Sequence, residues 1–194
     1  MPMLVMGQTC LMTDYEMSFY KPPVESHNTG RSLQNHCLTV YLETDYFTVQ
    51  SFSGDVDSVR TWMLSNWDSV KVLMLNEDVT INVTEVKIPT SQDWSEDLPG
   101  TYILYRFGIH AGDDVNGRFK HFMTKRDLGG GVAWLGGYCT PRQALYGTEG
   151  LIGYYGAYAV SGNLTKELEP IANNPWNYAV LAHEMGHNLG LNHT

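Results

Sequence analysis

The sequence predicts an α/β domain with a mostly parallel sheet. Two observations lead to this prediction: short segments rich in β-branched and aromatic residues recur along the chain, and segments with helical spacing of apolar residues lie between them. Strands that alternate with helices are typical of layered α/β folds, because a helical crossover returns the chain to the end where the next parallel strand begins. The sequence has no internal repeat and no low-complexity segment.

The first half of the chain predicts a strand, a helix and a second strand after an irregular, polar lead-in over residues 1–35. Residues 37–50 alternate and are rich in β-branched and aromatic side chains, which favours a strand. A helical pattern of apolar residues begins at Asp55, and its acidic first turn suits a helix start. Residues 79–89 alternate again and end at a proline, which favours a second strand.

The second half predicts one helix, a group of strands and a final helix. A loop over residues 90–100 precedes the first of these helices. In the final helix, Pro175 suits the first turn and Gly190 suits the end. The predicted elements are a helix over 101–112, strands over 119–124, 131–139 and 151–160, and a helix over 173–190.

Composition limits the classes of function. The 194 residues suit one domain, or one domain plus a lead-in. The net charge of −9 argues against general binding to nucleic acid or to anionic membranes. No apolar run is long enough to span a bilayer, and the N-terminal residues lack the basic region of a signal peptide. Nothing in the sequence indicates an oligomeric state.

The strongest signal is the segment HEMGHNLGLNH, which fits the pattern H-E-x-x-H-x-x-G-x-x-H. His183 and His187 are four residues apart, so a helix places them one turn apart on one face. His193 can approach them only if the helix ends and the chain turns back. Gly190 lies where that turn is needed, because glycine accepts the left-handed conformation that ends helices.

Three imidazoles form a neutral nitrogen site that favours zinc, with copper, nickel and cobalt as substitutes. Three protein ligands leave a fourth position for water, which is typical of catalytic zinc. Bound zinc lowers the pKa of water to about 7, and Glu184 is placed to take the water proton and pass it to a leaving amine. The pattern therefore predicts metal-assisted hydrolysis, most naturally of a peptide bond. The alternative is an amphipathic helix with polar surface histidines.

This segment resembles the metzincin zinc-peptidase signature, and its residues are most similar to those of the reprolysin-like, ADAM-type branch. Three further segments support the resemblance, which covers about residues 36–194: CLTVYLETDY, HFMTKRD and GGGVAWLGGYC. The resemblance implies a metzincin-like N-terminal subdomain with a twisted, mostly parallel sheet, one antiparallel edge strand and the active-site helix. It implies a zinc-dependent endopeptidase that acts on peptide or protein substrates and is secreted.

The family's functional residues carry over to matching positions in this chain. His183, His187 and His193 match the zinc ligands, and Glu184 matches the general base. The segment Gly131, Val132, Ala133, Trp134, Leu135, Gly136 resembles the edge strand that pairs with an extended substrate. The physics agrees, since an unpaired strand edge can add a peptide as another strand. An ordinary glycine-rich hairpin is the alternative for this segment.

The chain departs from the family pattern after its third histidine. Metzincins have a methionine-bearing turn downstream of that histidine, and the sequence stops at Thr194. We therefore expect a catalytic domain over 36–194 without the C-terminal subdomain, preceded by a lead-in or propeptide remnant over 1–35. The competing hypothesis is a catalytically incomplete module that binds metal or protein. Cys10, Cys37 and Cys139 form an odd set, and Cys10 is either an ordinary cysteine or, as the resemblance implies, a zinc cap in a latent form.

Overall fold

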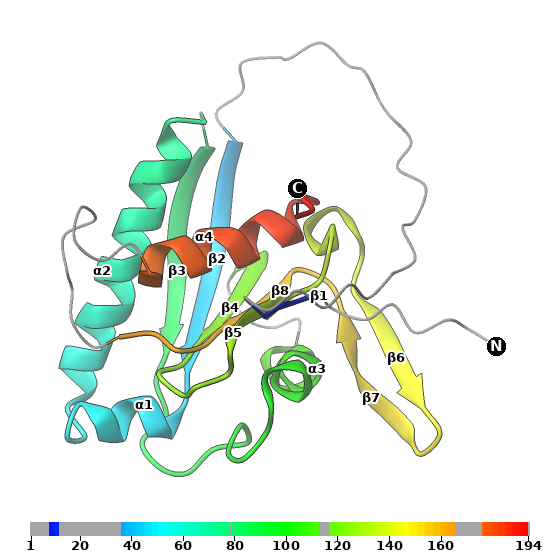
Figure 1. Ribbon diagram of the computed structural model, residues 1–194, viewed down its shortest axis with the longest axis horizontal. Coiled ribbons are helices and arrows are strands. Elements are labelled where there is room, and N and C mark those ends of the chain that lie inside the picture. The colour runs from blue at the N-terminus through cyan, green and yellow to red at the C-terminus, as the bar shows by residue number, and fades with distance from the viewer. Residues whose placement is uncertain (1–7, 12–35, 78, 113–116, 166–175, 194) are drawn as a thin grey trace.

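The computed structural model describes residues 8–11, 36–77, 79–112, 117–165 and 176–193. Its elements follow one another around a six-stranded sheet and a separate hairpin (Figure 1). They are β1 (Gln8–Leu11), β2 (His36–Thr44), α1 (Tyr46–Ser51), α2 (Val56–Leu75), β3 (Val79–Lys87), α3 (Gly100–Ala111), β4 (Phe119–Met123), β5 (Gly130–Ala133), the 3-10 turn η1 (Gly137–Cys139), β6 (Gln143–Gly147), β7 (Gly150–Tyr155), β8 (Tyr158–Ser161) and α4 (Trp176–Asn188).

The main sheet has the strand order β1-β5-β8-β4-β2-β3. Neighbours among β8, β4, β2 and β3 are parallel, whereas β5 is antiparallel to β8. The prediction of a mostly parallel sheet with one antiparallel edge strand is therefore confirmed for the five strands β3, β2, β4, β8 and β5, among which β5 is the antiparallel edge. The lead-in contains one strand that was not predicted, since β1 pairs antiparallel with the outer side of β5. Pairing with β1 satisfies backbone groups that would otherwise be exposed along β5.

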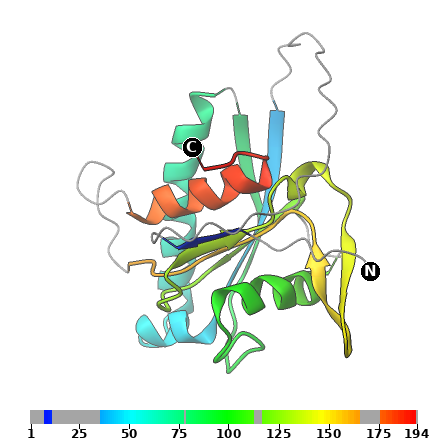
Figure 2. The ribbon, with the colours of Figure 1, turned by 45° about the vertical axis from the view of Figure 1, so that its right-hand side comes forward.

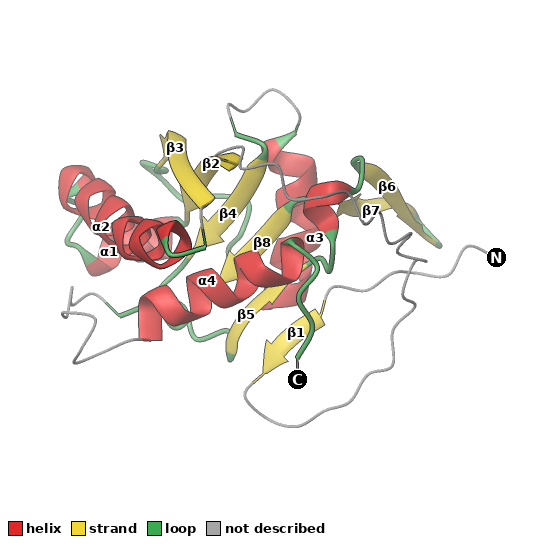
Figure 3. Cartoon of the chain, turned by 90° about the horizontal axis from the view of Figure 1, so that it is seen from above, coloured by secondary structure: helices red, strands yellow, loops and turns green. Residues whose placement is uncertain are grey.

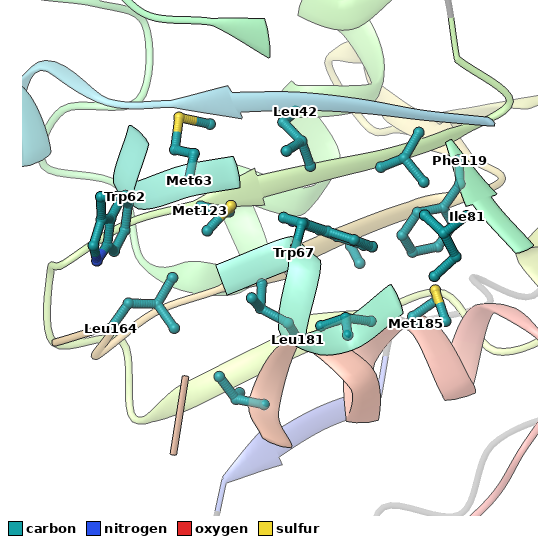
Figure 4. Packing of buried hydrophobic residues seen from close by; sticks show 14 of the residues in the cluster. Leu42, Trp62, Met63, Trp67, Ile81, Phe119, Met123, Leu164, Leu181 and Met185 are labelled. Carbon is teal, nitrogen blue, oxygen red and sulfur yellow. The ribbon is translucent and has the colours of Figure 1, made fainter. Parts of the chain in front are cut away.

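Helices cover both faces of this sheet (Figure 2). One face carries α2 and α4, and α3 lies on the opposite face. Seen from above, α4 runs across the sheet close to β5 and β8 (Figure 3). The larger core lies under α2 and α4, where Trp67, Leu181 and Met185 pack against Leu42 and Phe119 of the strands (Figure 4). This packing holds α4 against the sheet.

Capping aspartates set two element boundaries in the first half of the chain. Asp55 accepts hydrogen bonds from two backbone amides of the first turn of α2, so the predicted helix start is confirmed. The strand predicted over residues 37–50 is too long, because it ends at Thr44. Asp45 then accepts from the Thr48 amide at 2.9 Å and starts α1. The alternation beyond Thr44 therefore belongs to a short helix.

Two strand predictions in the second half also need correction. The strand predicted over 131–139 ends at Ala133 in the structure, and Gly137–Cys139 form a 3-10 turn. The strand predicted over 151–160 is two strands, β7 and β8. The β6–β7 hairpin was not predicted, although the turn residues GTEG between two apolar segments are a signal for one. The predicted role of Pro175 lies outside the described residues.

No helix within the described ranges is both long enough and apolar enough to cross a membrane.

Candidate metal and catalytic site

Helix α4 presents its histidines beside a buried, sheet-facing stripe. Leu181 and Met185 are fully buried and belong to the larger core. His183 and His187 lie one turn apart near the C-terminal end of the helix. His183 is exposed and His187 is buried, so the pair lies where the helix leaves the core. The apolar packing of α4 thus determines which way both rings face.

The helix ends in a turn that brings the third histidine back. Gly190 has φ +96°, and its amide donates to the His187 carbonyl at 2.9 Å. The Leu191 amide donates to the Gly186 carbonyl at 2.9 Å. These two bonds form a Schellman motif, the common glycine-dependent end of an α-helix. The sequence-based prediction that Gly190 reverses the chain is confirmed.

The turn gathers three imidazole nitrogens. The Nε2 atom of His183 lies 3.0 Å from that of His187 and 3.1 Å from that of His193, and the last two are 3.1 Å apart. Two nitrogen ligands of a tetrahedral zinc with bonds of about 2.0–2.1 Å are about 3.3 Å apart. The donor set and its spacing therefore fit one zinc ion. Among the described residues, this is the one cluster of histidine, cysteine and acidic groups able to hold a metal.

The hydrogen bond of His187 prepares its ring for a metal. Its Nδ1 lies 2.8 Å from the Leu191 carbonyl oxygen, which can only accept. Nδ1 therefore carries the proton and Nε2 keeps its lone pair in the neutral ring. Burial lowers the pKa of His187 and of His183, and the charge of His193 lowers the pKa of His183 further. Both effects favour the neutral imidazole that binds metal.

Glu184 lies on α4 between the two helical histidines in sequence, and its side chain is turned into the protein. Its exposed fraction is 0%. The atoms Cγ, Cδ and Oε1 pack directly over the α-carbon of Gly131 in β5. The carboxylate is therefore held between the active-site helix and the strand predicted to bind substrate.

The predicted substrate segment runs beside α4, but only part of it is a strand. β5 contains Gly131 to Ala133, and the chain then bends away, so the predicted strand over 131–136 is shortened. The Gly136 amide donates to the His187 carbonyl at 2.7 Å and ties this bend to the metal helix. Val132 and Trp134 have buried side chains, and the backbone of β5 pairs with β8 on one side and with β1 on the other.

Sequence reasoning missed one residue that joins these elements. Asn188 is fully buried, and its Nδ2 atom donates to the Tyr158 carbonyl of β8 at 2.9 Å. A polar residue four positions after Glu184, on the helix's buried side, was the available signal. Asn188 therefore fixes α4 on the sheet next to the histidines.

Two other histidines and two of the cysteines lie outside the site. His121 is buried in the sheet, and His110 lies by Glu43 on the far face. Cys37 and Cys139 are exposed and not disulfide-bonded. The side chain of Cys10 lies outside what the structure describes, so its suggested role as a zinc cap stays a prediction.

The sequence is similar to those of known metallopeptidases. The model of metallo-peptidase family M12 matches residues 34–194. A zinc metalloproteinase/disintegrin of Bitis gabonica is 23% identical over 164 residues, which are 80% of this chain and 45% of that protein. The chain therefore spans less than half the length of this relative. A chain from the structure of a chaperone-substrate complex superposes with a TM-score of 0.49 and 14% identity, over 81% of this chain and 24% of that one.

Proposed function

The chain belongs to metallo-peptidase family M12, and from that premise we propose that it is a zinc-dependent endopeptidase. In this proposal His183, His187 and His193 hold the zinc, and Glu184 is the general base. The observation that carries it is the triangle of Nε2 atoms, 3.0–3.1 Å apart, with Glu184 on the same helix. When bound, zinc lowers the pKa of a coordinated water to about 7 and polarises a carbonyl.

The place of the Glu184 carboxylate supports its proposed role as the base. It belongs to the same helical turn as two of the proposed ligands, and burial shields it from bulk water. A carboxylate in this position accepts a proton from the attacking water and later delivers it to the leaving amine. Because the carboxylate is buried, its electrostatic interaction with the water and with the leaving amine is stronger than it would be in bulk water.

We assign the outer side of β5 to the substrate backbone. β1 already pairs there as an extended antiparallel strand, with Gln8 opposite Ala133 and Leu11 opposite Gly130. That pairing supports strand addition as the binding mode, since main-chain hydrogen bonds give affinity without a specific side chain. The bend over residues 134–136 would continue the substrate path along α4. The buried side chains of Val132 and Trp134 support this backbone role.

The proposal divides the chain as the sequence suggested. Residues 36–194 form the catalytic unit and residues 1–35 precede it, which agrees with the family match over 34–194. An extracellular location is part of the proposal, because the family resemblance implies it. The exposed side chain of Asn82 on β3, within an N-x-T glycosylation sequence, supports it.

The first test measures zinc content and peptide cleavage on one preparation of the chain, beside Glu184→Gln. We expect about one zinc in both proteins and a loss of about 10²- to 10⁴-fold in kcat/KM for the variant. Glutamine keeps the size of the side chain and removes the base. Zinc binding without cleavage in the parent chain would favour the alternative of a metal- or protein-binding module. Full cleavage by Glu184→Gln would contradict the proposed mechanism.

A further inference from the structure

Three consecutive glycines, Gly129 to Gly131, span the start of β5, and their backbone conformations differ. Gly129 has φ +77° and Gly130 has φ +127°, a region that side-chain-bearing residues rarely adopt. Gly131 is not among the residues with positive φ. Its backbone would accept other amino acids, so the reason for glycine at this position must lie in its surroundings.

The atoms nearest to this position belong to one side chain. A Cβ atom added to Gly131 would lie 2.5 Å from Oε1 of Glu184 and 2.6 Å from both its Cδ and its Cγ. These three atoms are the nearest neighbours of that position, and all are closer than Cβ contacts allow. The missing side chain of Gly131 is therefore the space that the Glu184 carboxylate occupies.

Neither backbone can retreat to make room for a larger residue. Gly131 lies between two paired strands, opposite Ser161 of β8 and Cys10 of β1. On the other side, α4 is held by the bond from Gly136 to the His187 carbonyl and by the bond from Asn188 to β8. Any atom added at Gly131 would therefore displace the Glu184 side chain.

We propose that Gly131 is a positioning residue for Glu184, fixing where the carboxylate lies between α4 and β5 by leaving room for it. This inference rests on the proposed function, in which Glu184 is the base. Gly131 acts through Glu184, because its α-carbon lies under that side chain. A displacement of about 1 Å in a reacting group can cost about 10²-fold in rate.

The activity test compares Gly131→Ala with Gly100→Ala in the zinc-loaded chain. A Cβ at Gly100 would meet Leu128 at an ordinary 3.6 Å, so this variant controls for the added methyl group. We expect kcat to fall about 10²-fold in Gly131→Ala, with KM and zinc content little changed. Gly100→Ala should cleave like the parent chain. Parental kcat in Gly131→Ala would overturn the inference.

A stability cycle tests the contact without relying on activity. Gly131→Ala should lower Tm by about 2–10 °C in the parent chain, as overpacking does. In a Glu184→Ala background the obstructing side chain is gone, so Gly131→Ala should leave Tm nearly unchanged. An equal loss of Tm in both backgrounds would overturn the inference. If the parent chain cleaves no peptide, the proposed function fails, while this cycle still decides whether Gly131 makes room for Glu184.

Discussion

Two glutamates are buried on opposite faces of the sheet, and their surroundings differ. Glu43 of β2 is 3% exposed on the α3 face, and Glu184 of α4 is 0% exposed on the other. Glu43 accepts from the Tyr41 hydroxyl and from Trp94 Nε1 at 3.2 Å, and it lies 3.1 Å from His110 Nε2. Glu184 instead packs over Gly131, and it lies on the helix that carries two of the three clustered histidines.

The difference shows two uses of a buried carboxylate. Burial raises the pKa of Glu43, but hydrogen bonds from His110 and Tyr41 and the nearby positive charges of His110 and Lys87 outweigh it and leave that pKa lowered. Such a residue holds parts of the fold together. Glu184 has instead the space over Gly131, on the same helix as two of the clustered histidines, a setting that fits the proton exchange proposed for it. We therefore expect Glu43 to govern stability and Glu184 to govern cleavage.

The largest effect should come from Glu43→Ala. This change leaves the buried Tyr41 hydroxyl and the half-buried Trp94 ring nitrogen without their acceptor, and each such loss typically costs about 1–3 kcal/mol in the free energy of unfolding. Lys87→Met is the matched control, because its amine is 3.4 Å from Glu43 on a side chain that is 45% exposed. That variant should lose at most about 1 kcal/mol. Denaturant unfolding measures both, and kcat/KM per zinc-loaded molecule should not change.

The contrast between the two glutamates would fail if Glu184→Ala lost as much unfolding free energy as Glu43→Ala. It would also fail if Glu43→Ala stayed fully stable and lost cleavage.

His121 is a third buried ionisable group, and it differs from the two glutamates because it is buried in its uncharged form. Burial of His121 lowers its pKa from 6.5 to about 3, and its Nε2 lies 2.8 Å from the Ser161 hydroxyl. The unfolded chain takes up a proton below pH 6.5, whereas the folded chain does so only near pH 3. The stability that His121 contributes is present above pH 6.5 and is lost as the pH falls, by about 2–3 kcal/mol at pH 4.5.

Replacing this histidine should remove that part of the acid sensitivity. Between pH 7.5 and pH 4.5 the free energy of unfolding of both proteins should fall. The fall should be about 2–3 kcal/mol smaller in His121→Gln than in the parent. Both proteins are measured with a chelator, so that loss of zinc at low pH does not enter the difference. The same pH dependence in both proteins would show that His121 is not the responsible group.

The smallest effect should come from the turn that completes the histidine cluster. Gly190→Ala places a side chain at φ +96°, which costs about 1–2 kcal/mol in the free energy of unfolding. Gly54→Ala is the matched control, with φ +81° and, like Gly190, no atom within 4 Å of an added Cβ. Both should lose similar stability, but only Gly190→Ala should weaken zinc binding in a competition titration. Equal zinc affinity in the two variants would show that the turn at Gly190 does not contribute to zinc binding.

Sequence reasoning worked where the determinants are local. His183 and His187 share a helical face by spacing alone, and Gly190 allows the turn that returns His193. The central strands and helices were found for the same reason, since each carries its own periodicity. The strand predicted over 37–50 ran too far because Asp45, a helix cap, interrupts a pattern that still alternates.

The contacts that were not predicted join distant parts of the chain. Gly131 and Glu184 are far apart in sequence, and nothing in either segment indicates that one makes room for the other. The cluster around Glu43 likewise draws Trp94 and His110 from other elements. The pairing of β1 with β5 joins residues 8–11 to residues 130–133, and four residues carry too little pattern to reveal it.

This pairing bears on any measured peptide affinity. The outer edge of β5 can form its hydrogen bonds with one strand at a time, so β1 and a substrate strand exclude each other there. Because β1 belongs to the same chain, diluting the protein does not remove it. The apparent Kd of a peptide for this edge equals its intrinsic Kd divided by the fraction of molecules in which β1 has left. The apparent Kd from a titration with such a peptide therefore depends on the equilibrium by which β1 leaves the edge of β5.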